Sequence, residues 1–282
     1  MTLAVPNKGR LVEPTLRLLH DAGLVFEERD RSLVSRVENV DLDILFVRTN
    51  DVVEFVQDAV ADLGITGLDL LAESEVDLPI VRRLGYGRCR LTAAVPRDAD
   101  HQRPEDLAGL RVATSHPRAT RRWFDSRSID VEVIPLSGAV EVAPRLGLAE
   151  AIADLVSTGA TLATNGLRSI GDLLASEAIL VGNPVALDAR PDDVGRLDTM
   201  LSAVLEGRRR KYVMMNAPAE SLAELEALLP GLASPSVIPL AHAGMIAIHA
   251  VVDADDVWVL LPRLKDAGAS GILVLPIEKL IA

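Results

Sequence analysis

Short apolar runs alternate with helically spaced stretches along the first part of the chain. The strand-like runs are Leu3–Val5, Ile44–Val47, Asp62–Thr66, Ile80–Leu84, Leu91–Val95, Arg111–Ala113, Val131–Ile134 and Ile152–Val156. Helical spacing occurs at Leu11–Ala22, at Asp51–Ala59 and near Arg118–Asp125. Strands that alternate with helices indicate an α/β fold with a largely parallel sheet.

An internal repeat divides this α/β region. Residues 59–71 resemble residues 151–163 in sequence. The matched pairs are Asp62 and Asp154, Leu63 and Leu155, Thr66 and Thr158, and Gly67 and Gly159. Each copy predicts a strand, a tight Thr-Gly turn and the start of a helix. We interpret the repeat as two lobes like those of periplasmic binding proteins, facing across a cleft, which is a common ligand site. Chance similarity of two strand–turn–helix units is the alternative.

The chain is expected to cross between the lobes near Arg88–Pro96 and to return near Ile179–Pro184. A charged helix at Asp192–Arg210 then leads to a separate unit. The elements expected in that unit are a strand at Tyr212–Asn216, a helix at Ala219–Leu229, strands at Ser236–Ala241 and Met245–Val252, a helix at Asp255–Ala267 and a strand at Ile272–Leu275. The order βαββαβ is the ferredoxin-like pattern.

Composition narrows the class of protein. The chain has 282 residues and a net charge of -12, which argues against nucleic acid as a partner. No segment offers the roughly 18 apolar residues that cross a membrane. A polar N-terminus and the single cysteine, Cys89, favour a reducing cytoplasm. If the substrates are polyanions, the negative electrostatic field of the whole chain repels them, so local arginines and backbone amides must bind them.

Residues 154–161, Asp-Leu-Val-Ser-Thr-Gly-Ala-Thr, carry the most informative chemistry. A carboxylate ends an apolar strand, and a hydroxyl-rich turn with one glycine follows. Such a turn can aim several backbone amides at one anion, with the next helix adding its positive end. Asp154 could accept hydrogen bonds from sugar hydroxyls, which together with the turn describes a ribose 5-phosphate site. A simple helix cap is the alternative interpretation.

The same stretch resembles the phosphoribosyl pyrophosphate loop of phosphoribosyltransferases, which runs acid, two apolar residues, hydroxyl, Thr-Gly-x-Thr. Residues 141–162 are similar to the signature of the ATP phosphoribosyltransferase family. Further matching landmarks are 5–10, 47–48, 62–67 with Asp69, 89–91, 211–212, 235–237 and 271–277. The chain departs from the family at His116, where an aromatic Tyr is frequent, and at Ala153, where many other phosphoribosyltransferases have a second acid.

The resemblance implies a reaction that joins N1 of the adenine of ATP to C1 of the ribose and expels pyrophosphate. Asp154 and Glu141 would hold the ribose hydroxyls and favour a cationic ring. The residues implied to bind phosphoribosyl pyrophosphate are Ser157, Thr158, Gly159, Ala160 and Thr161. Mg²⁺ is expected on the pyrophosphate, arriving with the substrate, and no metal ligand is assigned in the chain.

For ATP the resemblance points to Lys8, Arg10, Arg48, Asp69 and Leu70. Lys8 and Arg10 follow the first strand, at the edge of a parallel sheet that usually carries ligands. The alternatives are a solvated basic loop for Lys8 and Arg10, and an exposed ion pair for Arg48.

The resemblance also implies separate catalytic and regulatory domains, and an inhibitor that binds the regulatory one. The expected domains are catalytic lobe I at 1–90 with 180–207, catalytic lobe II at 91–179, and a histidine-sensing unit at 211–282. Ser236 and Gly271 fall in the motifs associated with histidine, the inhibitor expected for the long form of the family. Inhibition of this kind requires a homo-oligomer, from dimer to hexamer.

Three other classes of protein compete with this hypothesis. A non-enzymatic two-lobed binding protein would bind the substrates without turnover. A purely regulatory module would bind its effector after deletion of residues 1–205. A porphobilinogen deaminase needs a cofactor-bearing cysteine, and the surroundings of Cys89 lack that motif.

Overall fold

A computed structural model describes residues 1–27, 33–229 and 234–281. The chain divides into two compact units, Met1–Arg17 with Leu24–Val194 and Leu18–Gly23 with Gly195–Ala282, which are described separately. In the described ranges, no helix has the length and apolar character needed to cross a membrane.

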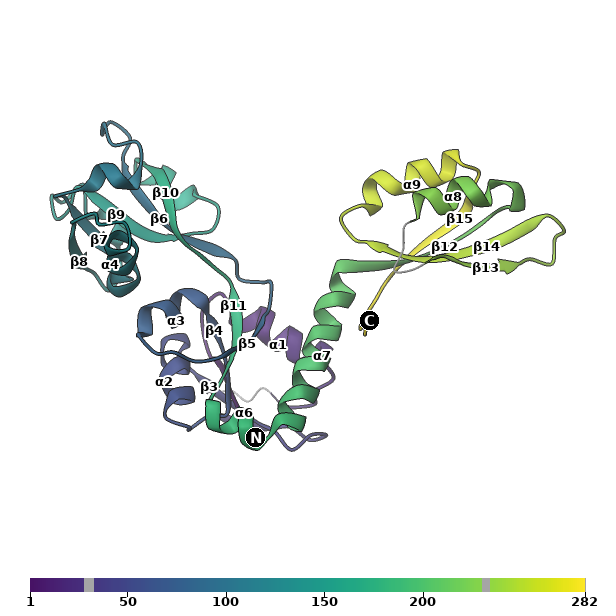
Figure 1. Cartoon of the computed structure of the whole chain (residues 1–282), viewed down its shortest axis with the longest axis horizontal. Helices are drawn as coiled ribbons and strands as arrows, with labels where there is room; N and C mark the ends of the chain where they lie inside the picture. Colours follow the sequence, from purple (N-terminus) through teal and green to yellow (C-terminus); the bar gives the residue numbers. More distant parts are fainter. Residues whose placement is uncertain (28–32, 230–233, 282) are drawn as a thin grey trace. The chain divides into compact units, whose positions relative to one another are not determined.

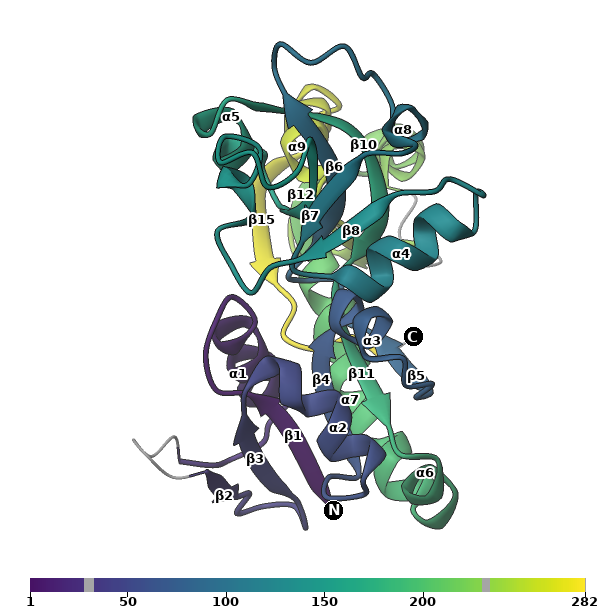
Figure 2. The same ribbon diagram turned by 90° about the vertical axis from the view of Figure 1, so that its left-hand side faces the viewer.

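The first unit contains two mixed sheets. The sheet of lobe I has the order β2-β3-β1-β4-β11-β5, in which β3, β1 and β4 are parallel (Figure 2). Its strands are β1 (Thr2–Pro6), β2 (Val34–Arg36), β3 (Asp43–Val47), β4 (Leu63–Gly67), β5 (Ile80–Arg83) and β11 (Ala178–Gly182). Its helices are α1 (Val12–Asp21), η1 (Thr49–Asp51), α2 (Val52–Gln57), α3 (Leu68–Ser74) and α6 (Pro184–Ala189).

The sheet of lobe II has the order β10-β6-β9-β7-β8, in which β9, β7 and β8 are parallel. Its strands are β6 (Cys89–Pro96), β7 (Arg111–Thr114), β8 (Glu132–Pro135), β9 (Ala151–Val156) and β10 (Leu167–Ser176). Its helices are η2 (Pro104–Leu107), α4 (Pro117–Asp125), η3 (Val140–Val142) and α5 (Ala160–Thr164). Alternate side chains along β9 enter different cores: Ala153 packs in one with Phe124 of α4, and Ile152 in the other with Leu162 of α5.

The chain crosses from lobe I to lobe II between β5 and β6, at residues 84–88, and returns at Glu177 between β10 and β11. The return therefore comes earlier than the predicted Ile179–Pro184. The reason is strand pairing: Ala178 and Ile179 are already paired antiparallel with Gly67 and Thr66 of β4.

The second unit contains α7 (Pro191–Arg209) and a four-stranded antiparallel sheet of order β13-β14-β12-β15. The elements are β12 (Arg210–Pro218), η4 (Ala219–Ser221), α8 (Leu222–Leu228), β13 (Ser236–Pro239), β14 (Met245–Asp253), α9 (Val257–Asp266) and β15 (Ser270–Pro276). Figure 1 shows α8 and α9 on one face of this sheet, where Leu225 and Leu264 join a core with Val213 and Ile248. The predicted ferredoxin-like pattern is confirmed, and with the two α/β lobes it confirms the predicted fold class.

Candidate active site

The parallel strands of lobe I bring the predicted ATP residues to one edge. Lys8 and Arg10 follow β1, Arg48 follows β3 and Asp69 follows β4, and the carboxyl ends of parallel strands meet at the same side of a sheet. The Arg10 guanidinium lies 3.7 Å from Asp69 Oδ1 and donates to the carbonyl of Gly87 at 2.7 Å. Arg10 and Asp69, both among the residues implied for ATP, therefore lie side by side in the fold.

Lobe II repeats this arrangement with different chemistry. The turn at 157–159 follows β9, His116 follows β7, and Glu141 lies in η3 after β8. These positions share the carboxyl-end edge of the parallel strands β9, β7 and β8. Asp154 lies inside β9, directly opposite Thr92 of β6, so the two side chains share one face of the sheet.

The carboxylate of Asp154 is half-buried and weakly solvated. Its Oδ1 accepts a hydrogen bond from the amide of Leu155 at 2.8 Å. Burial raises the pKa of Asp154 above its ordinary value, and the negative charge of Glu141 raises it further. The structure thus brings the two predicted ribose carboxylates close enough to interact electrostatically.

The hydroxyl-rich turn is open to solvent. Ser157 and Thr158 are exposed, and Gly159 has φ +82°, which favours glycine. No described atom lies within 4 Å of the position that a Cβ on Gly159 would take, so an anion has room to approach. The helix that follows, α5, has only five residues and offers little dipole, so the turn's own amides and hydroxyls are the main donors.

Two cavities border this turn. One, of about 280 Å³, is lined by Thr158 and Gly159 together with Arg90, Thr92 and Asp172, among others. The other, of about 460 Å³, lies at the crossing strands. Its lining includes Arg83, Arg88, Cys89, Arg90, Ser157 and Ser176.

Asp69 is a buried, fully engaged carboxylate, only 2% exposed. Ser176 Oγ donates to its Oδ1, and its own amide donates to Ser176 Oγ at 3.0 Å. Burial alone would raise the pKa of Asp69, but the contacts from His116 and Ser176 and the charge of Arg10 outweigh burial, and the pKa lies below its ordinary value. Asp69 is therefore ionised in the folded protein.

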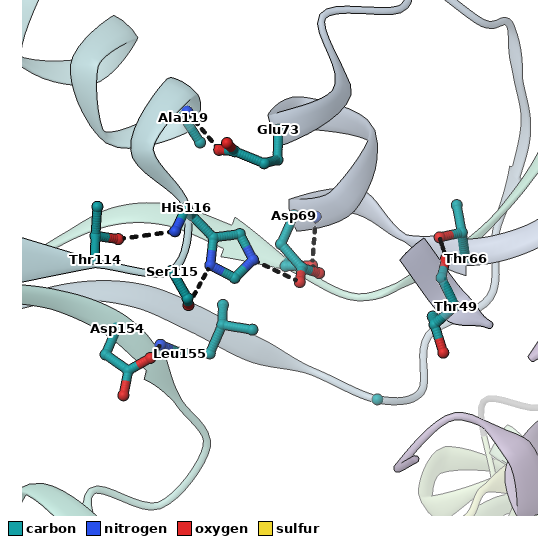
Figure 3. Close-up of polar contacts among 12 residues, drawn as sticks. Thr49, Thr66, Asp69, Glu73, Thr114, Ser115, His116, Ala119, Asp154 and Leu155 are labelled. Atoms are coloured by element: carbon teal, nitrogen blue, oxygen red, sulfur yellow. Dashed lines mark hydrogen bonds and ion pairs between the residues drawn. The ribbon is translucent and has the colours of Figure 1, made fainter. Parts of the chain in front are cut away.

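His116 is a site residue that sequence reasoning did not assign. Its buried ring lies between Asp69 of lobe I and the half-buried Asp154 of lobe II (Figure 3). Nδ1 is 3.0 Å from Ser115 Oγ, and Nε2 is 3.5 Å from Asp69 Oδ2. Within the described part of the chain, Nε2 makes no hydrogen bond of good geometry. In the tautomer with a proton on Nε2, which faces the anionic Asp69, Nδ1 accepts a hydrogen bond from Ser115 Oγ.

Next to this ring, Glu73 of α3 accepts hydrogen bonds that link lobe I to lobe II. Its carboxylate accepts the amides of Arg118 at 3.1 Å and Ala119 at 2.9 Å, in the first turn of α4 (Figure 3). A residue of lobe I thus caps a helix of lobe II, directly after His116. A cap supplied from a distant segment leaves no local sequence signal.

The structure does not bring the two predicted regulatory residues together within one chain. Ser236 lies on β13 and Gly271 on β15, which are opposite edges of the C-terminal sheet. Three strand spacings of about 4.8 Å separate those edges, roughly 14 Å.

In the described ranges, no three His, Cys, Asp or Glu side chains form a group that could hold a metal ion.

Lobe II has a half-buried acid before an open, hydroxyl-rich turn, and lobe I has an arginine beside a buried aspartate. Together they define a two-lobed protein suited to polyanionic ligands. A family model described as ATP phosphoribosyltransferase matches residues 48–204, and one described as HisG, C-terminal domain, matches residues 207–279.

Known relatives agree over the whole chain. An ATP phosphoribosyltransferase of Methanopyrus kandleri is 44% identical, covering 100% of this chain and 99% of the relative. One of Natronomonas pharaonis is 42% identical, covering 100% of both. A solved structure, the ATP phosphoribosyl transferase (HisG:HisZ) complex from Thermotoga maritima, is 32% identical with a TM-score of 0.62, over 73% of this chain and 98% of that chain.

The chain belongs to the ATP phosphoribosyltransferase family, in its long form, and is a pentosyl-transferring enzyme.

Proposed function

We propose that this enzyme transfers the 5-phosphoribosyl group of phosphoribosyl pyrophosphate to N1 of the adenine of ATP, as the first step of histidine biosynthesis. The observation that carries the proposal is the exposed segment 157–161, which follows the last three residues of β9, Asp154–Val156, and is bordered by a cavity that includes Thr158 and Gly159. Ser157, Thr158, Gly159, Ala160 and Thr161 bind the 5-phosphate through amides and hydroxyls. The products are N1-(5-phosphoribosyl)-ATP and pyrophosphate.

Asp154 and Glu141 act on the ribose. As the bond from C1 to the pyrophosphate oxygen lengthens, the leaving oxygen takes the electron pair and positive charge develops on the ring. The adenine N1 lone pair then forms the new bond to C1. The two carboxylates hold the ribose hydroxyls and stabilise the positive charge, so positioning and electrostatics provide the acceleration. A covalent enzyme intermediate is not required.

Lys8, Arg10 and Arg48 bind the phosphates of ATP, and Leu70 provides apolar contact for the base. All three basic side chains are exposed at the carboxyl-end edge of the lobe I sheet. Asp69 already accepts from Ser176 and lies 3.7 Å from Arg10. Its part is therefore to orient Arg10 towards ATP.

Mg²⁺ would be held mainly by the pyrophosphate of the substrate, where it would supply positive charge for the leaving group. Asp154 and Glu141 are the residues of this chain that would hold the ion, directly or through water, because their carboxylates lie near enough to interact and carboxylate oxygens suit Mg²⁺. A cytoplasmic location remains a prediction from the single cysteine, Cys89.

Residues 211–282 sense histidine and inhibit the enzyme. Ser236 and Gly271 lie on opposite edge strands, so one histidine can contact both only where the sheets of two chains meet. The proposal therefore includes a homo-oligomer, from dimer to hexamer, in which the effector favours the less active state.

Asp154→Asn tests the reaction. We expect turnover, measured as pyrophosphate release from ATP and phosphoribosyl pyrophosphate, to fall by roughly a hundredfold or more, because a charge near the cationic ring is lost. Asp62→Asn is the matched control: Asp62 is the repeat counterpart of Asp154, but its carboxylate accepts the amide of Thr2 at 2.6 Å. Near-normal turnover of Asp154→Asn, or binding of both substrates by the wild-type protein without turnover, contradicts the proposal.

A further inference from the structure

The phosphate-binding turn has no charge of its own. Residues 155–161 are Leu, Val, Ser, Thr, Gly, Ala and Thr, and the chain as a whole carries a net charge of -12. A sugar phosphate approaching this turn meets a repulsive overall field, so a local cation is needed to offset it. The question is which basic side chain of the fold reaches the turn.

Arg90 of β6 is in that position. It is paired in register with Val156, the last residue of β9 and the neighbour of Ser157. Directly opposite residues of an antiparallel pair lie about 5 Å apart and share a face of the sheet. Arg90 lines the cavity that contains Thr158 and Gly159, and it also lines the cavity that contains Ser157. Arg90 therefore lines both of the cavities that border the turn.

Arg90 now pairs with Asp172, and a stronger anion can replace that carboxylate. Arg90 Nη1 donates to Asp172 Oδ2 at 3.1 Å, and the two side chains are 54% and 40% exposed. Thr92 Oγ1 donates to Asp172 Oδ1 at 2.8 Å, so Asp172 keeps a partner when Arg90 moves. An ion pair that is this open to solvent adds little to stability. A phosphate dianion offers the planar guanidinium a stronger, bidentate contact.

We propose that Arg90 is the cationic part of the 5-phosphate site, and that its guanidinium exchanges Asp172 for the phosphate held by the turn 157–161. This inference rests on the proposed function for the identity of the sugar, and it deepens that proposal by naming the residue that supplies the positive charge. Arg90 acts on binding, since it contacts the phosphate and not the reacting C1.

The first experiment measures binding of ribose 5-phosphate to the full chain by titration calorimetry. Arg90→Gln is expected to weaken binding roughly tenfold or more, because a charge-assisted contact is lost. The control is Arg83→Gln: the exposed side chain of Arg83 lines the larger cavity and also forms an ion pair, with Glu177 at 3.1 Å. The control is expected to bind within about twofold of the wild type. Equal binding by Arg90→Gln and the wild type overturns the inference.

A second variant tests the exchange itself. Asp172→Asn removes the competing carboxylate but keeps an oxygen for Thr92 and Arg90, so ribose 5-phosphate should bind about threefold more tightly. That gain should vanish when Arg90→Gln is also present, because no guanidinium remains to be released. Weaker binding by Asp172→Asn would show that Asp172 holds Arg90 in place, and would overturn the exchange.

The outcomes separate this inference from the proposed function. Selective loss of ribose 5-phosphate binding in Arg90→Gln, in a protein without pyrophosphate release, keeps the inference and removes the proposed reaction. Turnover in the wild type, together with undiminished ribose 5-phosphate binding by Arg90→Gln, keeps the proposed reaction and removes the inference about Arg90. A wild-type protein that binds no ribose 5-phosphate contradicts both.

Discussion

Two aspartates of the site have pKa values displaced in opposite directions, although both are removed from solvent. Asp154 has one amide donor and an acidic neighbour, Glu141, so burial dominates and its pKa is raised. Asp69 has Ser176, His116 and Arg10 around it, and these contacts more than offset burial. Opposite displacements of this kind are typical of functional sites, where environment assigns different roles to like residues.

The raised pKa of Asp154 predicts a stability gain on substitution. Between the ordinary pKa of 3.8 and the higher folded value, the folded state binds more protons than the unfolded state, so stability falls as pH rises through that window. At about pH 7 the penalty is fully present, and Asp154→Asn, which removes it, should raise the free energy of unfolding. Near pH 3.8 the free energies of unfolding of Asp154→Asn and the wild type should no longer differ for this reason. Urea unfolding at both pH values measures the effect.

Asp69→Asn provides the contrasting case. A lowered pKa contributes stability above the ordinary value of 3.8 that is lost as pH falls through the folded value. The free energy of unfolding of Asp69→Asn should therefore be lower than that of the wild type at neutral pH. If Asp154→Asn also proves less stable there, hydrogen bonding rather than desolvation dominates at Asp154.

At the scale of elements, α4 depends on a cap from the other lobe. Glu73→Ala leaves the amides of Arg118 and Ala119 without their acceptor and should lower the free energy of unfolding by about 1 kcal/mol. Those two amides should also exchange hydrogen faster. Denaturant unfolding and hydrogen exchange measure the two effects.

Glu75→Gln is the matched control for this prediction. Glu75 pairs with the side chain of Arg118 at 3.5 Å and accepts no helix amide in the described ranges; the side chains of Glu75 and Arg118 are 66% and 52% exposed. Such a pair is worth about 0–1 kcal/mol, usually at the low end. If Glu75→Gln destabilises the protein as much as Glu73→Ala does, side-chain charge on α4 matters more than the cap.

The internal repeat shows which local features of an element can be predicted from the sequence. Gly67 and Gly159 both directly precede a helix, as predicted. Thr66, however, is buried inside β4, whereas Thr158 is exposed in a turn. The difference arises because β11 pairs with β4 as far as Gly67, while the pairing of β9 ends at Val156. Similar sequences therefore yield one turn that is open to solvent and one that is not, and the partner strands decide which.

At the scale of the whole molecule, the long form should separate catalysis from regulation. Deleting residues 211–282 should abolish inhibition by histidine while leaving turnover measurable, because the proposed catalytic and effector residues lie in different compact units. Initial rates with and without histidine provide the measurement. Inhibition that survives the deletion would place the effector site in the lobes.

The sequence alone determined the features that depend on neighbours along the chain: the order of strands and helices, the ferredoxin-like unit, and the acid followed by a hydroxyl-rich turn at 154–161. Periodicity, glycine and hydroxyl side chains act locally, so they can be read locally. Only the tertiary structure decided that His116 lies beside Asp69, that Glu73 caps α4 and that Arg90 pairs with Val156, just before the turn. These contacts depend on strand pairing and lobe packing between residues distant in sequence, which no local pattern encodes.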